Sequence, residues 1–176
     1  MTKPIIIFEG LNCTGKSSLI EQIKDDNIYI HNNRAEFLNV RMVDAIYGYM
    51  KAMIDILSFS KIPMWFDRFH WTEYVYGVVK RGYDEYTASK IFAEIDYRLS
   101  ELNNVRVVYL YDDVTNICNR TIKLRKWGDI DTIKELNMRM TRCAEASNLL
   151  IKAVNYGELI SSKEEMNKLI DFVRGE

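Results

Sequence analysis

The chain has 176 residues, 48% of them hydrophobic, and its 24 lysines and arginines face 25 aspartates and glutamates, which leaves a net charge of −1. This length predicts one domain with a full core, spanning residues 1–176, and the balanced charge gives no general signal for nucleic acid or a membrane surface as a partner. Three widely spaced cysteines without a C-x-x-C pair argue against disulfides and structural zinc, and no apolar stretch reaches the roughly 18 residues of a membrane span, so we expect a cytoplasmic protein.

Short apolar runs alternate with longer stretches of helical spacing along the whole chain. The runs predicted to be strands cover residues 5–8, 27–30, 62–66, 105–110 and 149–154, the second being the least regular. The stretches predicted to be helices cover residues 16–24, 37–57, 72–80, 85–102, 131–147 and 163–173. The runs lack polar alternation, as strands buried on both faces of a parallel sheet do. We therefore predict an α/β fold, a doubly wound parallel sheet of about five strands with helices on both faces.

The stretch FEGLNCTGKSSL, residues 8–19, follows the first predicted strand and fits the phosphate-loop pattern G-x-x-x-x-G-K-[ST]. Its glycines let backbone N–H groups wrap around an anion at the start of the next helix. Lys16 would contact the β- and γ-phosphates of ATP, and the Ser17 hydroxyl would ligate Mg²⁺. A chance match in a glycine-containing turn is the alternative, and the position between a strand and a helix argues against it. The residues expected to bind ATP here are Gly10, Asn12, Cys13, Thr14, Gly15, Lys16, Ser17 and Ser18.

Two other classes of phosphate-loop protein fit the chain less well. A regulatory GTPase reads guanine with an N-K-x-D signature, but the string NKLID at residues 167–171 is one residue too long and lies in a predicted helix. A motor-type ATPase would show an apolar strand that ends in Asp-Glu, which the chain lacks. A small-molecule kinase fits best.

A second informative stretch, FDRFHWTEYVYG, begins at Phe66 and comes directly after the third predicted strand. In a doubly wound sheet, ligands bind at the carboxyl ends of the strands, so Asp67 and Arg68 should emerge beside the phosphate loop. Arg68 could bridge the donor and acceptor phosphates, and Asp67 could orient Mg²⁺-bound water or fix the arginine. An ordinary Asp-Arg pair at a strand end is the alternative. We expect both residues to be catalytic, with Asp67 and Ser17 at the metal.

These two stretches resemble the motifs of the thymidylate kinases, within the wider thymidylate/deoxynucleoside kinase group of P-loop kinases. The family's loop, F-E-G-x-(D/E)-x-x-G-K-(S/T)-(S/T), matches residues 8–18, and its D-R-Y-x-x-S-x-x-A-Y-Q motif matches residues 67–77. The resemblance implies a P-loop kinase that uses ATP and Mg²⁺ in nucleotide biosynthesis. It also implies that the acceptor nucleotide is bound by Arg68, Phe69, Thr72 and Tyr76.

The chain departs from the family pattern at three positions. Asn12 replaces an acidic residue, Phe69 lacks the usual tyrosine hydroxyl, and Gly77 replaces a glutamine that lies near the base. The two motifs are also closer together than usual, and the missing segment normally carries a further phenylalanine and arginine on the base side. The motifs therefore leave the identity of the acceptor base open.

The resemblance implies roles for further arginines. Arg34, in the string HNNRAEF after the second strand, stands where the family grips the acceptor's monophosphate. The string NRTIKLRKWGD resembles the family's lid, which we place at about residues 118–129 and which closes over ATP. Cys13 stands where some members carry a catalytic arginine in the loop, so the lid must supply it. Arg125 is the first choice, and Arg120 the second or else a contact to adenine; a solvated basic stretch is the alternative reading.

We therefore expect a nucleoside monophosphate kinase that transfers the γ-phosphoryl group of ATP to a deoxynucleotide such as dTMP or a related pyrimidine. Its acceptor phosphate is already anionic, so no strong base is needed. One alternative is a deoxynucleoside or nucleic-acid 5′-hydroxyl kinase, in which Glu9 would act as general base. Another is a nucleotide-binding module without catalysis. The expected partners are ATP and the deoxynucleotide, without nucleic acid or membrane, and a homodimer is compatible with the sequence.

Overall fold

The computed structural model describes residues 4–25, 28–32, 43–60, 62–123 and 129–175. Within this part of the chain, five strands form one sheet in the order β2-β3-β1-β4-β5, and all four pairings are parallel. The strands are β1 (Ile5–Glu9), β2 (Tyr29–Asn32), β3 (Met64–Asp67), β4 (Val105–Tyr111) and β5 (Leu150–Asn155). The predicted fold class and the parallel sheet are confirmed.

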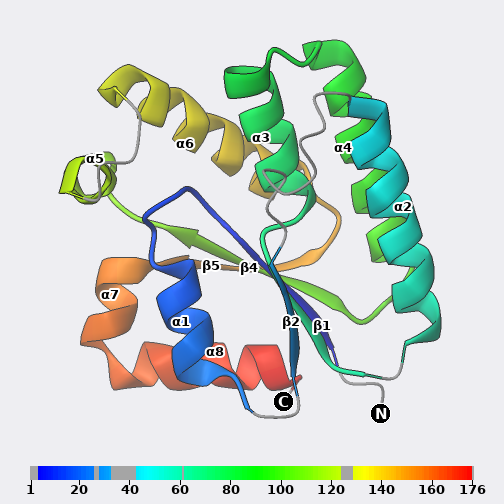
Figure 1. Ribbon diagram of the computed structural model, residues 1–176. Coiled ribbons are helices and arrows are strands. Elements are labelled where there is room, and N and C mark those ends of the chain that lie inside the picture. The colour runs from blue at the N-terminus through cyan, green and yellow to red at the C-terminus, as the bar shows by residue number, and fades with distance from the viewer. Residues whose placement is uncertain (1–3, 26–27, 33–42, 61, 124–128, 176) are drawn as a thin grey trace.

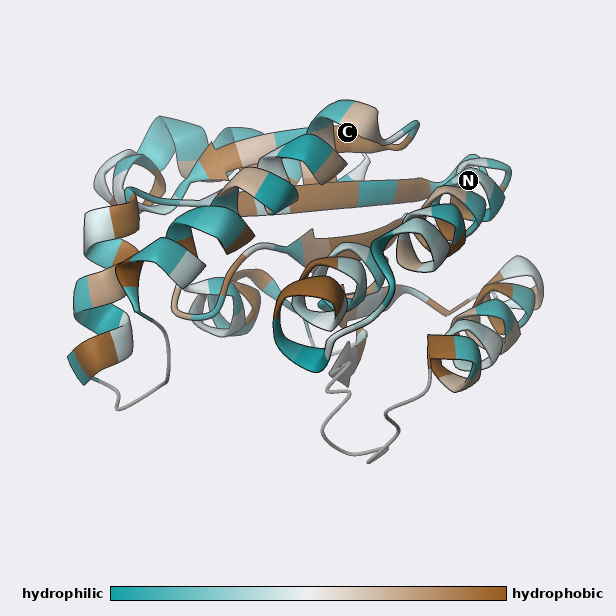
Figure 2. Cartoon of the chain, turned by 90° about the horizontal axis from the view of Figure 1, so that it is seen from above, coloured by the Kyte–Doolittle hydropathy of each residue, from teal (hydrophilic) through white to brown (hydrophobic). Residues whose placement is uncertain are grey.

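Helices cover both faces of this sheet, as Figure 1 shows. One face carries α2 (Val43–Phe59), α3 (His70–Arg81), α4 (Glu85–Ser100), α5 (Val114–Lys123) and α6 (Ile130–Ala146). The other face carries α1 (Lys16–Ile23), α7 (Tyr156–Ser161) and α8 (Lys163–Arg174). In Figure 2 the hydrophobic strands lie between these two layers, whose outer sides are largely hydrophilic.

Strand β1 shows why the apolar runs lack polar alternation. Ile5 and Ile7 pack into the core beneath α2, α3 and α4, whereas Ile6 and Phe8 pack into the core beneath α1 and α8. Ile6, Ile7 and Phe8 have no exposed surface, and each such side chain contributes roughly 1.5–3 kcal/mol by burial. A strand in the middle of a doubly covered sheet is therefore apolar at every position.

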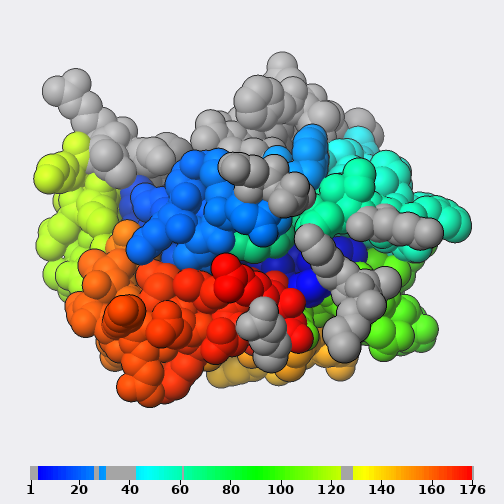
Figure 3. Space-filling view, turned by 90° about the horizontal axis from the view of Figure 1, so that it is seen from below, coloured from blue at the N-terminus to red at the C-terminus, as the bar shows by residue number. Residues whose placement is uncertain are grey.

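The two ends of the described chain lie side by side on one face. In Figure 3, α1 lies directly beside α7 and α8, although these helices come from opposite ends of the sequence. Leu19 and Ile20 of α1 share a core cluster with Leu159 of α7 and Leu169 of α8. Among the described residues, no helix has both the length and the apolar character needed to span a bilayer.

Two helices were not predicted from the sequence. Helix α5 includes residues 118–123, which we expected to begin a lid. Of these residues, Cys118 and Thr121 are buried, so one side of this helical turn packs on the rest of the fold. Residues 124–128 lie outside the described part of the chain. Helix α7 has six residues and a single buried side chain, Leu159, so it carries almost no periodic signal. Helix α2 begins at Val43 in the described chain, and residues 37–42 of the predicted helix lie outside it.

Candidate active site

The phosphate loop, residues 10–17, joins β1 to α1 at the carboxyl end of the sheet. Its backbone takes positive φ values of 140° at Gly10 and 91° at Gly15. A Cβ on Gly10 would lie 2.2 Å from the carbonyl oxygen of Leu110, and a Cβ on Gly15 would lie 2.3 Å from the ring of Tyr156. Both glycines are therefore needed for the loop to fit between β4 and the start of α7.

The side chain of Lys16 is folded into the loop. It is 4% exposed, and its Nζ donates to the carbonyl oxygens of Gly10 at 2.7 Å and Leu11 at 2.6 Å. Burial and, next, the positive charge of Arg68 lower the pKa of Lys16 to about 7. A phosphate bound in the loop would place negative charge beside this amine and favour its charged form. Lys16 is thus positioned to bind an anion.

Two oxygen-bearing side chains meet beside Lys16. The Ser17 hydroxyl donates to Oδ2 of Asp67 at 2.9 Å, and Asp67 Oδ1 is buried without a hydrogen-bond partner in the described residues. A buried carboxylate oxygen that lacks a donor fits a cation or its bound water. The described residues contain no cluster of three or more His, Cys, Asp or Glu that could hold a metal. Mg²⁺ at this place would therefore be held by Ser17, Asp67, phosphate oxygens and water, as this cation commonly is.

Arg68 directly follows β3 and has a φ of 76°, a conformation that costs a residue other than glycine about 1–3 kcal/mol. Its backbone N–H donates to the carbonyl oxygen of Phe8 at 2.9 Å, and its guanidinium donates to Asn12 Oδ1 at 2.5 Å. The Nε of Arg68 is buried and has no partner in the described residues. The guanidinium is therefore tied to the phosphate loop and keeps a free donor.

Glu9 acts as the cap of helix α3, although it lies on β1. Its Oε1 accepts from the backbone N–H groups of Phe69 at 2.9 Å and Trp71 at 3.0 Å. Its Oε2 accepts from the backbone N–H of Thr72 at 3.2 Å and from the Thr72 hydroxyl at 2.5 Å. Burial raises the pKa of this carboxyl, which has no exposed surface, while the helix N-terminus favours its charge. In this arrangement Glu9 caps α3, and its role as a general base in the alternative nucleoside kinase stays a prediction.

Three of the residues expected to bind the acceptor, Phe69, Thr72 and Tyr76, make different contacts within the protein. Phe69 is 1% exposed and packs against Phe66 with ring centroids 5.0 Å apart, so it belongs to the core. The hydroxyl of Thr72 is used on Glu9, as described above. Tyr76 accepts a hydrogen bond from the backbone N–H of Asn12 at 3.0 Å and thereby ties α3 to the phosphate loop. Each of these three side chains thus has a partner within the described structure, and their contact with an acceptor stays a prediction.

A cavity of about 260 Å³ opens on the phosphate loop. We call it the donor cavity; the expected donor-binding residues that line it are Cys13, Gly15, Lys16, Ser17, Ser18 and Arg120, and Arg68 lies on its wall. Gly10, Asn12 and Thr14 do not line it; Thr14 donates to the carbonyl oxygen of Leu11 at 2.9 Å and so braces the loop. The cavity brings together three cationic side chains at the carboxyl end of the sheet.

Two residues of the donor cavity's surroundings were missed in the sequence. Asp112, just after β4, forms a 2.5 Å ion pair with Arg120, and Tyr156, just after β5, lies under the Arg120 guanidinium with 5.7 Å to the ring centroid. Both follow strand ends, and the rule that found Asp67 could have found them too. Arg34 and Arg125 lie outside the described residues.

Two solved structures are similar to the chain. The YorR protein from Bacillus subtilis, solved in complex with phosphorylated GDP, has a TM-score of 0.73 and 21% identity, with 96% of this chain and 94% of that chain covered. Polyphosphate kinase 2 from Arthrobacter aurescens TC1 has a TM-score of 0.69 and 13% identity, with 97% of this chain and 68% of that chain covered. No protein-family model matches the chain, and no curated protein matches it. The chain has a P-loop kinase-like fold.

Proposed function

We propose that the protein is a nucleoside monophosphate kinase that transfers the γ-phosphoryl group of ATP to a deoxynucleotide. One observation carries this proposal: Lys16, Ser17 and Arg68 line one cavity at the carboxyl end of the sheet, and Ser17 is hydrogen-bonded to Asp67. A phosphate loop alone would fit any nucleotide-binding protein, whereas a second strand end with an arginine and an aspartate fits phosphoryl transfer. The similarity to YorR, solved with phosphorylated GDP, also supports a nucleotide ligand.

In this proposal the bond between the γ-phosphorus and the bridging oxygen of ATP breaks, and a new bond forms to an oxygen of the acceptor phosphate. Lys16 neutralises negative charge on the β- and γ-phosphates, and Arg68 lies between donor and acceptor. Mg²⁺, when bound, would neutralise charge on the departing phosphate oxygens. The phosphate loop and the end of β3 hold these groups in place, so that catalysis rests on position and charge.

An acceptor that is already anionic agrees better with the site than a hydroxyl does. A hydroxyl acceptor must lose a proton, and the general base expected for it, Glu9, is buried and bound to four donors. We therefore favour the monophosphate over a deoxynucleoside or a nucleic-acid 5′-hydroxyl. By the resemblance to thymidylate kinases, the acceptor is dTMP or a related pyrimidine nucleotide. Arg34 would bind its phosphate, and Arg125, or else Arg120, would stabilise the transferring group.

The test is turnover with ATP and Mg²⁺ against a panel of deoxynucleoside monophosphates and the matching deoxynucleosides. We expect formation of ADP and of a deoxynucleoside diphosphate with the monophosphates only. Arg68→Gln should lower kcat by more than about tenfold without loss of folding, because its charge acts in the transition state. Arg98→Gln, on the exposed end of α4, is the matched control. Turnover with deoxynucleosides alone would replace this proposal with the nucleoside kinase, and ligand binding without turnover would replace it with the binding module.

A further inference from the structure

The two arginines of the donor cavity are held in different ways. Arg120 forms a 2.5 Å ion pair with the carboxylate of Asp112, so its positive charge is matched by a negative one. Arg68 donates at 2.5 Å to an uncharged group, the side-chain amide of Asn12. None of the ion pairs among the described residues includes Arg68. Within this part of the chain, the charge of one arginine is compensated and that of the other is not.

The carboxylate next to Arg68 in the sequence is not its partner. Asp67 is turned towards the phosphate loop, where its Oδ2 accepts from the Ser17 hydroxyl at 2.9 Å. The guanidinium of Arg68 is held instead by the side chain of Asn12. An arginine only donates hydrogen bonds, so the atom of Asn12 that faces it must be the amide oxygen. Asn12 therefore gives Arg68 an acceptor and adds no negative charge.

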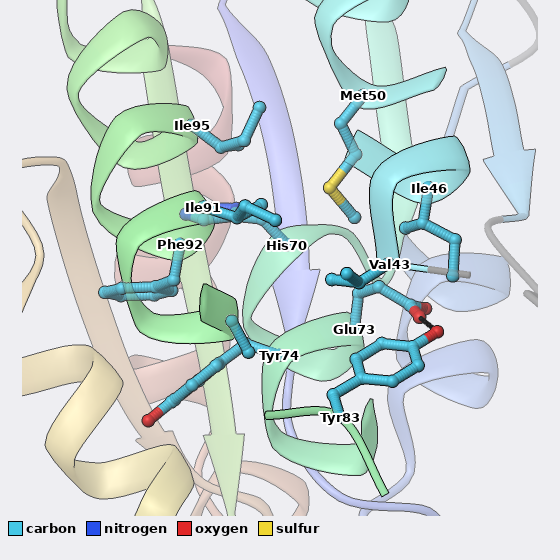
Figure 4. A pocket seen from close by; sticks show the side chains of 11 residues that line it. Val43, Ile46, Met50, His70, Glu73, Tyr74, Tyr83, Ile91, Phe92 and Ile95 are labelled. Atoms are coloured by element: carbon cyan, nitrogen blue, oxygen red, sulfur yellow. Dashed lines mark hydrogen bonds between the residues drawn. The ribbon is translucent and has the colours of Figure 1, made fainter. Parts of the chain in front are cut away.

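Asn12 is itself fixed by helix α3. Its backbone N–H donates to the hydroxyl of Tyr76 at 3.0 Å. Helix α3 is closely packed: as Figure 4 shows, His70 points from it into the hollow between α2 and α4, whose free volume is about 20 Å³, room for about one water molecule. The Nε2 atom of His70 also lies 3.1 Å from a carboxylate oxygen of Asp96 on α4. Tyr76 is therefore a fixed point, and through Asn12 it fixes the guanidinium of Arg68.

We infer that Asn12 is a positioning residue that holds Arg68 without cancelling its charge, and that it thereby makes the site select an acceptor with a phosphate over one that offers only a hydroxyl. The inference rests on the proposed function, in which Arg68 lies between the donor and acceptor phosphates. A phosphate monoester brings about −1.5 to −2 charges at pH 7. An uncompensated guanidinium attracts it more strongly than one already paired with a carboxylate, whereas a nucleoside brings no charge and gains nothing.

The departure of residue 12 from the family pattern thus has a physical meaning. The family has an acidic residue at this position, and this chain has an amide. Aspartate has nearly the same shape as asparagine and can accept the same hydrogen bond from Arg68, so the position of the guanidinium does not require the amide. The amide changes the charge of the site, which is less negative by one. Asn12 does not line the donor cavity, so this change should affect the acceptor more than ATP.

The test is titration calorimetry, without ATP, of dTMP, dCMP, dAMP and dGMP and of the matching deoxynucleosides. For the base that binds most tightly, the dissociation constant of the nucleoside is divided by that of the monophosphate. Asn12→Asp keeps the bond to Arg68 and adds a negative charge, so this ratio should fall at least about tenfold. Asn12→Ala loses one hydrogen bond and adds no charge, so the ratio should fall about fivefold or less. Asn167→Asp, the same change at an exposed residue of α8, should leave the ratio unchanged.

Steady-state kinetics with ATP give a second readout, in which Asn12→Asp should raise the KM for the monophosphate and leave the KM for ATP nearly unchanged. An unchanged ratio in Asn12→Asp, or a larger loss in Asn12→Ala than in Asn12→Asp, would overturn the inference, because the hydrogen bond alone would then matter. Loss of folding by Asn12→Asp in urea would also contradict it, because the new carboxylate should pair with Arg68. Phosphorylation of deoxynucleosides alone by the wild type would refute the proposed function, and the binding ratios would still decide the role of Asn12.

Discussion

Replacement of Lys16 with methionine tests whether this lysine binds the phosphates of the nucleotide, because its amine should take up a proton when they bind. In the free protein, burial and Arg68 hold the pKa of Lys16 at about 7, compared with 10.5 for an ordinary lysine. A bound diphosphate should raise this pKa again, because it places negative charge beside Nζ. Since the pKa is lower in the free protein than in the complex, binding above about pH 7 must take up a proton. Below that pH the amine of Lys16 is already charged, so it adds no pH dependence to nucleotide binding.

The size of the effect follows from the same pKa. At about pH 9, roughly one free protein molecule in a hundred carries the charged Lys16 amine. Protonation of this amine on binding therefore costs about 2.7 kcal/mol of the binding free energy. The affinity for ADP should therefore fall about tenfold per pH unit above pH 7, and about 100-fold by pH 9. A residue with an ordinary lysine pKa would produce no such fall over this range.

Titration calorimetry of ADP with Mg²⁺, in buffers of different ionisation enthalpy, measures both the affinity and the protons exchanged. The wild type should take up close to one proton per ADP near pH 9, whereas Lys16→Met should bind weakly and without this pH dependence. Lys24→Met, at an exposed lysine that pairs with Glu21, is the control and should behave as the wild type. Equal affinity and no proton uptake by the wild type between pH 7 and pH 9 would refute the reasoning.

Three further changes test other parts of the site. Glu9→Ala removes the acceptor of three backbone N–H groups at the start of α3. The free energy of unfolding, measured in urea, should therefore fall by at least about 3 kcal/mol. A loss below about 1 kcal/mol would contradict the capping role. Gly15→Ala places a Cβ against Tyr156 at a positive φ, and should lower the free energy of unfolding by about 2–4 kcal/mol. Adding Tyr156→Ala should restore part of this loss, whereas strictly additive losses in the double variant would speak against this contact. Arg34→Ala should raise the KM for the acceptor roughly ten- to a hundredfold and leave the KM for ATP unchanged, in steady-state kinetics with both substrates varied; an unchanged acceptor KM would place the acceptor phosphate elsewhere.

The sheet and the phosphate loop could be predicted because their signals are local. A strand covered on both faces is apolar throughout, and the loop needs glycine where the backbone φ is positive. Both signals are carried by consecutive residues, as in β1 and in residues 10–17. The positions of Asp67 and Arg68 followed from one further rule, that strands of a parallel sheet end together.

Two predicted site residues, Glu9 and Phe69, make contacts that the sequence does not display. Glu9 looked like a free carboxylate beside a nucleotide site, but its partners are backbone groups 60 or more residues away. Those contacts also explain why α3 begins at His70, two residues before the predicted start, since its cap comes from another element. Phe69 was expected at the acceptor by its place in a motif, and its burial against Phe66 depends on tertiary packing.

The residues that hold the phosphate loop in place lie far from it in the sequence. This separation affects when, during synthesis, the protein can first bind a nucleotide. During synthesis the loop is made before its partners, because Glu9, Asn12 and Ser17 find their partners only when residues 67–76 have been made. The ring that packs on Gly15, that of Tyr156, is made later still. A nascent chain would therefore carry the signature residues long before it could hold a nucleotide. Nucleotide binding should therefore stabilise only those chains in which the loop has already met residues 67–76 and Tyr156.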